Sequence, residues 1–213
     1  MEGRDTQYPI LASLDASFRA PRSVHLKRAD GLGRMPNDHY ETDYSTVERC
    51  LAALEVQVTR PCILDLGAGS GRWGKVARRL WPSAFIYGVE IRDVERPEKY
   101  DGWLTGDFPV CAHQIRLEYD LVIGNPPYAC AEAFVRAGLL LLRDGGQLGF
   151  LLRLAFLEGQ GRRDGLFKEF PPRAVEVCSK RPSFSEDGKT NATAFAFFIW
   201  QKGYRGEPRV RWL

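Results

Sequence analysis

Four consecutive residues, Asn125-Pro126-Pro127-Tyr128, place two hydrogen-bond acceptors and an aromatic ring directly after an apolar stretch. The side-chain oxygen of Asn125 and the backbone carbonyl of Pro126 can accept hydrogen bonds from the two hydrogens of one amino group. Pro127 restricts Pro126 to an extended conformation, which helps to fix the direction of that carbonyl. Tyr128 offers a ring on which a planar group can stack. The alternative is a turn that ends a strand and carries a space-filling aromatic side chain.

A glycine-rich stretch from Asp65 to Gly71 is the second candidate site. It follows a short apolar run and precedes residues with helical spacing, and in parallel sheets such turns let the backbone approach a ligand. Glu90, at the end of the next apolar run, can accept hydrogen bonds from both hydroxyls of a ribose. We therefore expect a cofactor that contains adenosine. Gly69, Gly71 and Gly74 also fit the dinucleotide pattern G-x-G-x-x-G, and a tight turn beside a surface carboxylate is the structural alternative.

The elements that must position these residues alternate along the chain. Apolar runs predict seven strands, at 62–66, 85–90, 103–105, 119–124, 146–153, 174–178 and 193–201. Helices are predicted at 44–58, 73–81 and 129–142, with a helical turn at 166–170. This order indicates an α/β fold with a mostly parallel, seven-stranded sheet flanked by helices. The direction of the last two strands stays open.

The first forty residues show no sustained apolar period and contain several turn formers, which predicts an N-terminal arm before a catalytic domain at 41–213. The longest uninterrupted apolar run, 194–200, is too short for a membrane helix, and the N-terminus has no signal-peptide layout. Five cysteines without a C-x-x-C pair suggest neither a disulfide framework nor a metal site. These features favour a cytoplasmic protein without membrane association.

Charge is distributed unevenly although the net charge is only +3. Residues 151–213 carry 12 basic and 7 acidic side chains, whereas residues 41–150 carry 12 basic and 15 acidic ones. A basic excess of this kind can attract a polyanion, and a solvated surface is an equally ordinary explanation.

The order of the two motifs resembles the class I S-adenosylmethionine-dependent methyltransferases that act on a planar exocyclic or amide nitrogen. In that family, Asp-x-Gly-x-Gly-x-Gly follows the first strand and (Asp/Asn)-Pro-Pro-aromatic follows the fourth, as they do over residues 38–201 here. The resemblance implies a Rossmann-like class I methyltransferase fold and S-adenosylmethionine as cofactor, with Glu90 at the ribose and Asp107 at the adenine. The cofactor contacts that it implies are Asp65, Gly67, Ala68, Gly69, Gly71, Glu90, Asp107 and Asn125. A carboxylate that caps a turn is the alternative for Asp107.

The chemistry of such a nitrogen explains the proposed catalytic residues, Asn125, Pro126, Pro127 and Tyr128. An amino nitrogen conjugated to a purine ring is a poor nucleophile because its lone pair is delocalised. Two acceptors directed at its hydrogens favour the tetrahedral geometry from which it can attack a methyl group. No strong general base is then needed, because the proton leaves after methyl transfer. A base within a duplex would first have to flip out.

Two further segments resemble a narrower group, the small DNA adenine-N6 methyltransferases of phages and prophages. Residues 38–42 look like its Asp-x-Tyr-x-Thr segment, which implies that Tyr40 and Thr42 contact the cofactor. The group often has proline next, where this chain has Asp43, and a helix N-cap at Thr42 or Asp43 is the alternative. Residues 150–162 and 180–184 also look like that group. The side chains predicted to contact the nucleic acid are Tyr128, Arg153, Arg162, Arg163, Lys180 and Arg181.

These residues predict an enzyme that transfers a methyl group from S-adenosylmethionine to the N6 amino group of adenine in DNA. One alternative is methylation of another planar nitrogen, in a ribosomal RNA base or a protein glutamine. The other is a catalytically silent methyltransferase-like module that binds nucleic acid. Intact Asp65, Glu90 and Asn125 argue against the silent module.

Overall fold

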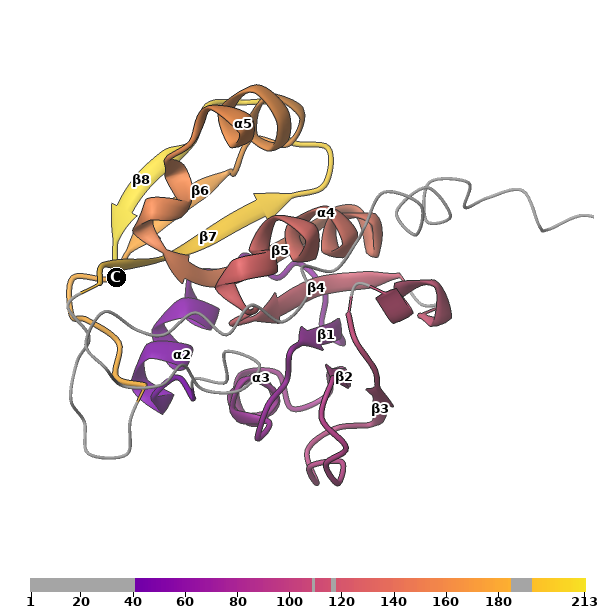
Figure 1. Ribbon diagram of the computed structural model, residues 1–213. Helices are drawn as coiled ribbons and strands as arrows, with labels where there is room; N and C mark the ends of the chain where they lie inside the picture. Colours follow the sequence, from indigo (N-terminus) through magenta and orange to yellow (C-terminus); the bar gives the residue numbers. More distant parts are fainter. Residues whose placement is uncertain (1–40, 109, 116–117, 185–192) are drawn as a thin grey trace, which may run out of the picture.

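The computed structural model describes residues 41–108, 110–115, 118–184 and 193–213. They form a single eight-stranded sheet with the order β3-β2-β1-β4-β5-β7-β6-β8 (Figure 1). The arm predicted at residues 1–40, including Tyr40, lies outside the described residues.

Five strands make up the parallel part of the sheet, with β1 (Cys62–Leu66) between β2 (Phe85–Glu90) and β4 (Tyr119–Gly124). β3 (Gly102–Thr105) extends the sheet beyond β2, and β5 (Leu142–Arg153) lies beside β4. The bounds of β1, β2 and β4 are those predicted. Because these strands are parallel, their carboxyl ends share one edge of the sheet. That edge is the rim on which the glycine turn, Glu90 and Asn125 lie.

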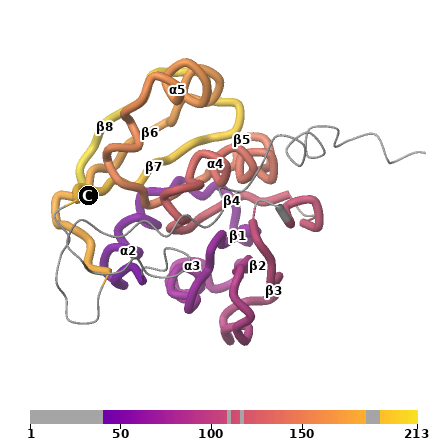
Figure 2. Tube along the Cα trace, viewed as in Figure 1, coloured from indigo at the N-terminus to yellow at the C-terminus, as the bar shows by residue number. Residues whose placement is uncertain are grey.

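The remaining three strands settle the direction left open by the sequence. β7 (Phe195–Gln201) is antiparallel to both β5 and β6 (Ala174–Val177), and β8 (Arg209–Trp212) is parallel to β6. β6 and β8 therefore run in the same direction as β5. The prediction of seven strands was wrong by this one strand, since β8 has four exposed residues at the edge of the sheet and no apolar run to reveal it. In Figure 2, β6, β7 and β8 lie on one side of the molecule and β1, β2 and β3 on the other.

Helices cover both faces of the sheet, and the sheet separates two core clusters. α2 (Tyr44–Ala52) and α3 (Arg72–Leu80) pack on one face, where the core includes Leu51, Trp73 and Phe197. α4 (Ala131–Leu140) and the segment after β5 pack on the other, where the core includes Phe134, Leu166 and Phe198. That segment contains α5 (Gln160–Arg162) and a π-helical turn, Arg163–Phe167.

Two helices are shorter than predicted because side chains or strands intervene. α2 ends at Ala52 rather than residue 58, and the backbone N–H of Glu55 donates to Gln147 Oε1 at 2.9 Å instead of continuing the helix. α4 begins at Ala131, after a 3₁₀ turn at Tyr128–Cys130, and ends at Leu140. Leu142 pairs with Tyr119 of β4, so β5 starts earlier than the predicted residue 146. Among the described residues, no helix has the length and apolar character needed to cross a membrane.

Candidate active site

The glycine turn after β1 is bonded directly to the end of β2. The backbone N–H groups of Gly67 and Ala68 both donate to the carbonyl of Val89, at 2.9 and 3.0 Å. The N–H of Gly69 donates to Glu90 Oε2 at 2.7 Å. Gly67, Gly69 and Gly71 have φ angles of 70°, 59° and 84°, in the left-handed region that favours glycine. The structure thus brings the predicted turn residues and Glu90 together.

Glu90 is a buried carboxylate, with 5% of the residue exposed. Its Oε1 accepts from the backbone N–H of Arg92 at 3.1 Å and from Arg92 Nε at 2.8 Å. Burial acts to raise the pKa of Glu90, but the hydrogen bonds from Arg92 and Gly69 outweigh it and hold the pKa below its usual value. Glu90 is therefore ionised at neutral pH. A carboxylate has about four acceptor positions, so a ribose hydroxyl would share Glu90 with Arg92. The sequence analysis did not single out Arg92.

Asp65, at the end of β1, is fully buried and only half satisfied. Tyr100 donates its hydroxyl hydrogen to Asp65 Oδ2 at 2.5 Å, whereas Oδ1 has no hydrogen-bond partner in the described part of the chain. Burial raises the pKa of Asp65 to about 7. A buried oxygen of this kind is costly to leave unsatisfied, so Oδ1 is a candidate acceptor for an N–H or ammonium group of a ligand.

Tyr100 lies over the glycine turn and was missed by the sequence analysis. Its hydroxyl oxygen also accepts from the backbone N–H of Gly74, at 3.1 Å. A Cβ atom at Gly74 would lie 2.3 Å from Cζ of the Tyr100 ring, which is far inside van der Waals contact. Gly74, the third glycine of the G-x-G-x-x-G pattern, therefore makes room for a protein side chain. Tyr100 comes from the loop between β2 and β3, where no motif marked it.

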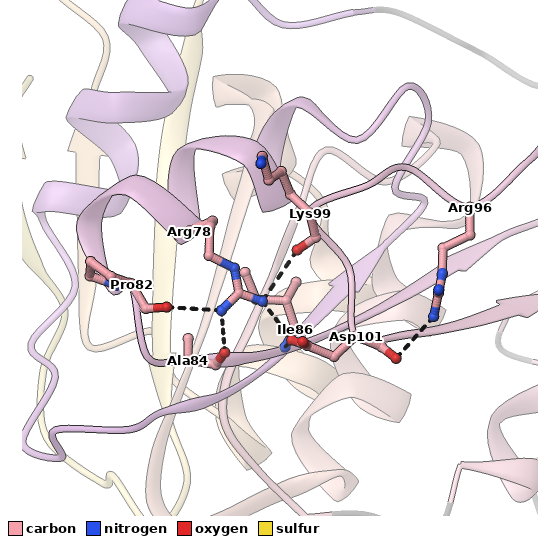
Figure 3. A network of polar contacts seen from close by, with 7 residues as sticks. All are labelled: Arg78, Pro82, Ala84, Ile86, Arg96, Lys99 and Asp101. Atoms are coloured by element: carbon pink, nitrogen blue, oxygen red, sulfur yellow. Dashed lines mark hydrogen bonds and ion pairs between the residues drawn. The ribbon is translucent and has the colours of Figure 1, made fainter.

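Arg78 of α3 fixes the loop that carries Tyr100. Its guanidinium donates to Asp101 Oδ2 at 2.5 Å, and the same oxygen accepts from the backbone N–H of Ile86 at 2.8 Å (Figure 3). It also donates to three backbone carbonyls, those of Pro82, Ala84 and Lys99. One side chain thus joins the end of α3, the start of β2 and the residue before Tyr100.

The Asn125 loop lies directly beside the glycine turn. Gly124 has a φ angle of 151°, and a Cβ atom there would lie 2.5 Å from the carbonyl oxygen of Leu66, the last residue of β1. β1 and β4 are paired up to Asp65 and Ile123, so both loops leave adjacent strands at one level. Asn125 Nδ2 donates to Thr42 Oγ1 at 3.2 Å. Pro126, which follows, is buried.

Tyr128 and Arg153 form a stacked pair at the same rim. The guanidinium carbon of Arg153, the last residue of β5, lies 4.7 Å from the centroid of the Tyr128 ring. Phe195, the first residue of β7, packs against Tyr128 with a centroid separation of 5.8 Å. The predicted stacking residue and one predicted basic contact are therefore neighbours.

The other predicted basic residues have different surroundings. Arg162 donates to the backbone carbonyls of Phe156 and Glu158 and lies over the Phe156 ring. These contacts stabilise the loop that carries Arg162. Arg163 bonds Asp164 at 2.8 Å. Lys180 and Arg181 are exposed, in the loop after β6.

Asp107 is exposed and follows a segment held against Glu90. The backbone N–H of Gly106 donates to the carbonyl of Glu90 at 2.8 Å. The backbone carbonyl of Asp107 accepts from Cys111 N–H at 2.9 Å. Partial burial raises the pKa of the Asp107 carboxyl. The predicted cofactor role of Asp107 stays a prediction.

Three features bear on whether this rim fits the cofactor expected from the sequence. Asp65 Oδ1 is an unsatisfied buried acceptor, and a Cβ atom built on Gly67 would have no atom within 4 Å, so open space borders the turn. Buried Glu90 adds an ionised acceptor at the end of the next strand. These residues fit a ligand with a cationic amino group and a ribose. The described residues contain no cluster of His, Cys, Asp or Glu able to hold a metal ion.

Comparison with solved structures identifies the fold as that of class I methyltransferases. A putative class I S-adenosylmethionine-dependent methyltransferase from Listeria monocytogenes is 15% identical, with a TM-score of 0.61 over 80% of this chain and 64% of that one. A predicted O-methyltransferase from Agrobacterium tumefaciens is 21% identical, with a TM-score of 0.56 over 78% and 85%. The M protein of the type I restriction enzyme EcoKI is 12% identical, with a TM-score of 0.59 over 78% and 44%. No family model and no curated protein matches the chain.

Proposed function

We propose that this protein transfers a methyl group from S-adenosylmethionine to the exocyclic N6 amino group of adenine in DNA. The observation that carries the proposal is the contact between the Asn125 loop and the glycine turn, since Gly124 packs against the carbonyl of Leu66 at the end of β1. A group held at the glycine turn and a group held by Asn125 would therefore be neighbours.

The donor side of the proposal rests on three acidic side chains. Asp65 Oδ1, buried and unsatisfied, suits the amino group of the methionine portion, and Glu90 suits the ribose hydroxyls. Asp107 follows the segment bonded to Glu90 and suits the adenine. When bound, S-adenosylmethionine would supply a methyl group on a positively charged sulfur. The protein contributes the placement of this group relative to the acceptor.

The acceptor side rests on Asn125 and Pro126. The side-chain oxygen of Asn125 and the carbonyl of Pro126 accept the two hydrogens of the target amino group and withdraw it from conjugation with the ring. Tyr128 stacks on the base, an interaction worth about 1–3 kcal/mol per base in single-strand binding. An entering base would also meet the Arg153 guanidinium, which already lies on the Tyr128 ring and can stack on a base in the same way.

Nucleic acid is favoured over a protein glutamine by charge. Residues 151–213 carry 12 basic and 7 acidic side chains. At the rim, Arg153 at the end of β5 is exposed, as are Lys180 and Arg181 after β6. A ribosomal RNA base and a protein glutamine are the competing substrates within the same chemistry. A silent nucleic-acid-binding module is the competitor without chemistry, and the unsatisfied carboxylate at Asp65 argues against it.

The test is methyl transfer to unmethylated DNA, RNA and protein in parallel, followed by nucleoside analysis. We expect N6-methyladenine in DNA. Asn125→Ala should reduce turnover by about 10²–10³-fold, because it removes an interaction aimed at the reacting group, and it should leave donor binding within about twofold of wild type. Methyl transfer to RNA or protein alone would contradict the DNA assignment, and unchanged turnover of Asn125→Ala would remove Asn125 from the mechanism.

A further inference from the structure

Thr42 makes a direct side-chain contact with the candidate catalytic amide. It is 2% exposed, and its Oγ1 accepts from Asn125 Nδ2 at 3.2 Å, across 83 residues of sequence. An asparagine amide has an acceptor oxygen on one side and a donor nitrogen on the other. With the nitrogen turned to Thr42, the oxygen faces away from it. Only that oxygen can accept a hydrogen from an amino group.

The backbone around Thr42 is anchored on both sides, so its hydroxyl has a fixed position. On one side, Arg72 at the start of α3 donates to the carbonyl of Thr42 at 3.2 Å and forms an ion pair with Glu41. On the other side, the N–H of Asp43 donates to the carbonyl of Ser183 at 3.2 Å, and the N–H of Ser183 donates to Asp43 Oδ2 at 3.1 Å. Thr42 is thus tied to α3 and to the loop after β6.

The backbone of Asn125 is equally constrained. Gly124 packs against the carbonyl of Leu66, and Pro126 restricts the conformation of Asn125. A hydrogen bond to the end of the side chain favours one orientation of the amide over the flipped one. Thr42 provides this bond from a separate segment of the chain.

We infer that Thr42 is a positioning residue: it holds the Asn125 amide with the oxygen directed toward the target amino group. The inference rests on the proposed function, and it differs from the direct cofactor contact that the sequence suggested for Thr42. The site then favours a substrate that donates hydrogens, such as an amino group, over one that offers only an acceptor.

Three variants test this role. Thr42→Val keeps the shape and removes the hydroxyl, so kcat should fall about tenfold, the equivalent of one hydrogen bond, with KM for the donor within about twofold. Thr42→Ser keeps the hydroxyl and should recover most of the lost kcat. Thr46→Val is the matched control, because Thr46 is just as buried and bonds Asp43 at 2.8 Å without contact to Asn125. It should keep kcat near that of wild type.

A second measurement does not depend on turnover. The side-chain amide signals of Asn125, assigned by their loss in Asn125→Ala, should shift in the ¹⁵N NMR spectrum of Thr42→Val and stay in place in Thr46→Val. A loss of donor affinity in Thr42→Val with unchanged kcat would overturn the inference in favour of a cofactor contact. Equal losses of kcat in both valine variants would overturn it in favour of a general effect on the fold. Absence of methyl transfer by the wild-type protein would instead overturn the proposed function.

Discussion

At the scale of single residues, Asp65 makes the stability of the protein depend on pH. Burial raises the pKa of Asp65 from its ordinary value of 3.8 to about 7. Between these two pH values, the folded protein keeps a proton that the unfolded chain has released. The contribution of Asp65 to the free energy of unfolding therefore falls as the pH rises through this window and stays low above it. The total change is roughly 4 kcal/mol at about 1.4 kcal/mol per pKa unit.

Asp65→Asn should remove this dependence, because an amide does not ionise. We compare the free energy of unfolding of the variant with that of wild type, measured by urea unfolding at pH 4 and at pH 8. From the lower to the higher pH, the difference should shift in favour of the variant by a few kcal/mol. Glu90, whose pKa is lowered, acts in the opposite direction, but it is present in both proteins and cancels in the difference. Asp144→Asn, which replaces an exposed carboxyl, is the control. If the difference in stability between Asp65→Asn and wild type did not change with pH, the raised pKa of Asp65 would be contradicted.

The sequence identified the residues with recognisable spacing and missed their partners. The glycine turn, Glu90 and Asn125 follow apolar strands, so their position on one rim could be expected from a parallel sheet. Tyr100 and Arg92 could not be predicted, because each acts through a contact made only in the folded chain. Asp43 is the N-cap of α2, with Thr46 N–H at 2.9 Å from its Oδ1, which confirms one of the alternatives weighed for that segment.

At the scale of elements, the loop between β2 and β3 depends on Arg78. Arg78→Ala removes four hydrogen bonds, among them the charged one to Asp101, and should lower the free energy of unfolding by about 2 kcal/mol. The loop would then hold Tyr100 less firmly against the glycine turn. We expect a several-fold increase in the dissociation constant of the donor, measured by calorimetry.

Arg79 provides the matched control on the same helix. Its side chain is 61% exposed and lies 3.6 Å from Glu48, so Arg79→Ala should change stability by less than about 0.5 kcal/mol. Donor affinity should also stay at the wild-type value. If both variants lost affinity equally, the helix as a whole would be responsible instead of the Arg78 network.

The central strands were predictable as elements because each is a short apolar run. The end of α2 was not, because the apolar spacing continues to Val58 and only the bond from Glu55 N–H to Gln147 diverts the chain. β8 was missed for the opposite reason. Its residues are exposed, and only pairing with β6 makes them a strand.

At the scale of the whole molecule, one tryptophan lies in the core and another lies at the exposed edge of the sheet. Trp200 in β7 is 1% exposed and donates its indole N–H to the carbonyl of Phe170 at 3.1 Å. Trp212 in β8 is 71% exposed. Trp200→Phe should lower the free energy of unfolding by about 2 kcal/mol, since it leaves a gap and an unpaired carbonyl. Trp212→Phe should change it by less than about 0.5 kcal/mol. Denaturant unfolding of both variants checks this. Equal effects would contradict the placement of Trp200 in the core and of Trp212 at the exposed edge.

β7 lies between β5 and β6 in the sheet but follows both along the chain. Its side chains fill both core clusters, with Phe195 and Phe197 on one face and Phe198 and Trp200 on the other. During synthesis, β5 and β6 therefore leave the ribosome before the strand that joins them exists. The nascent chain must keep an open strand edge and two incomplete cores from aggregating until residue 201 has emerged.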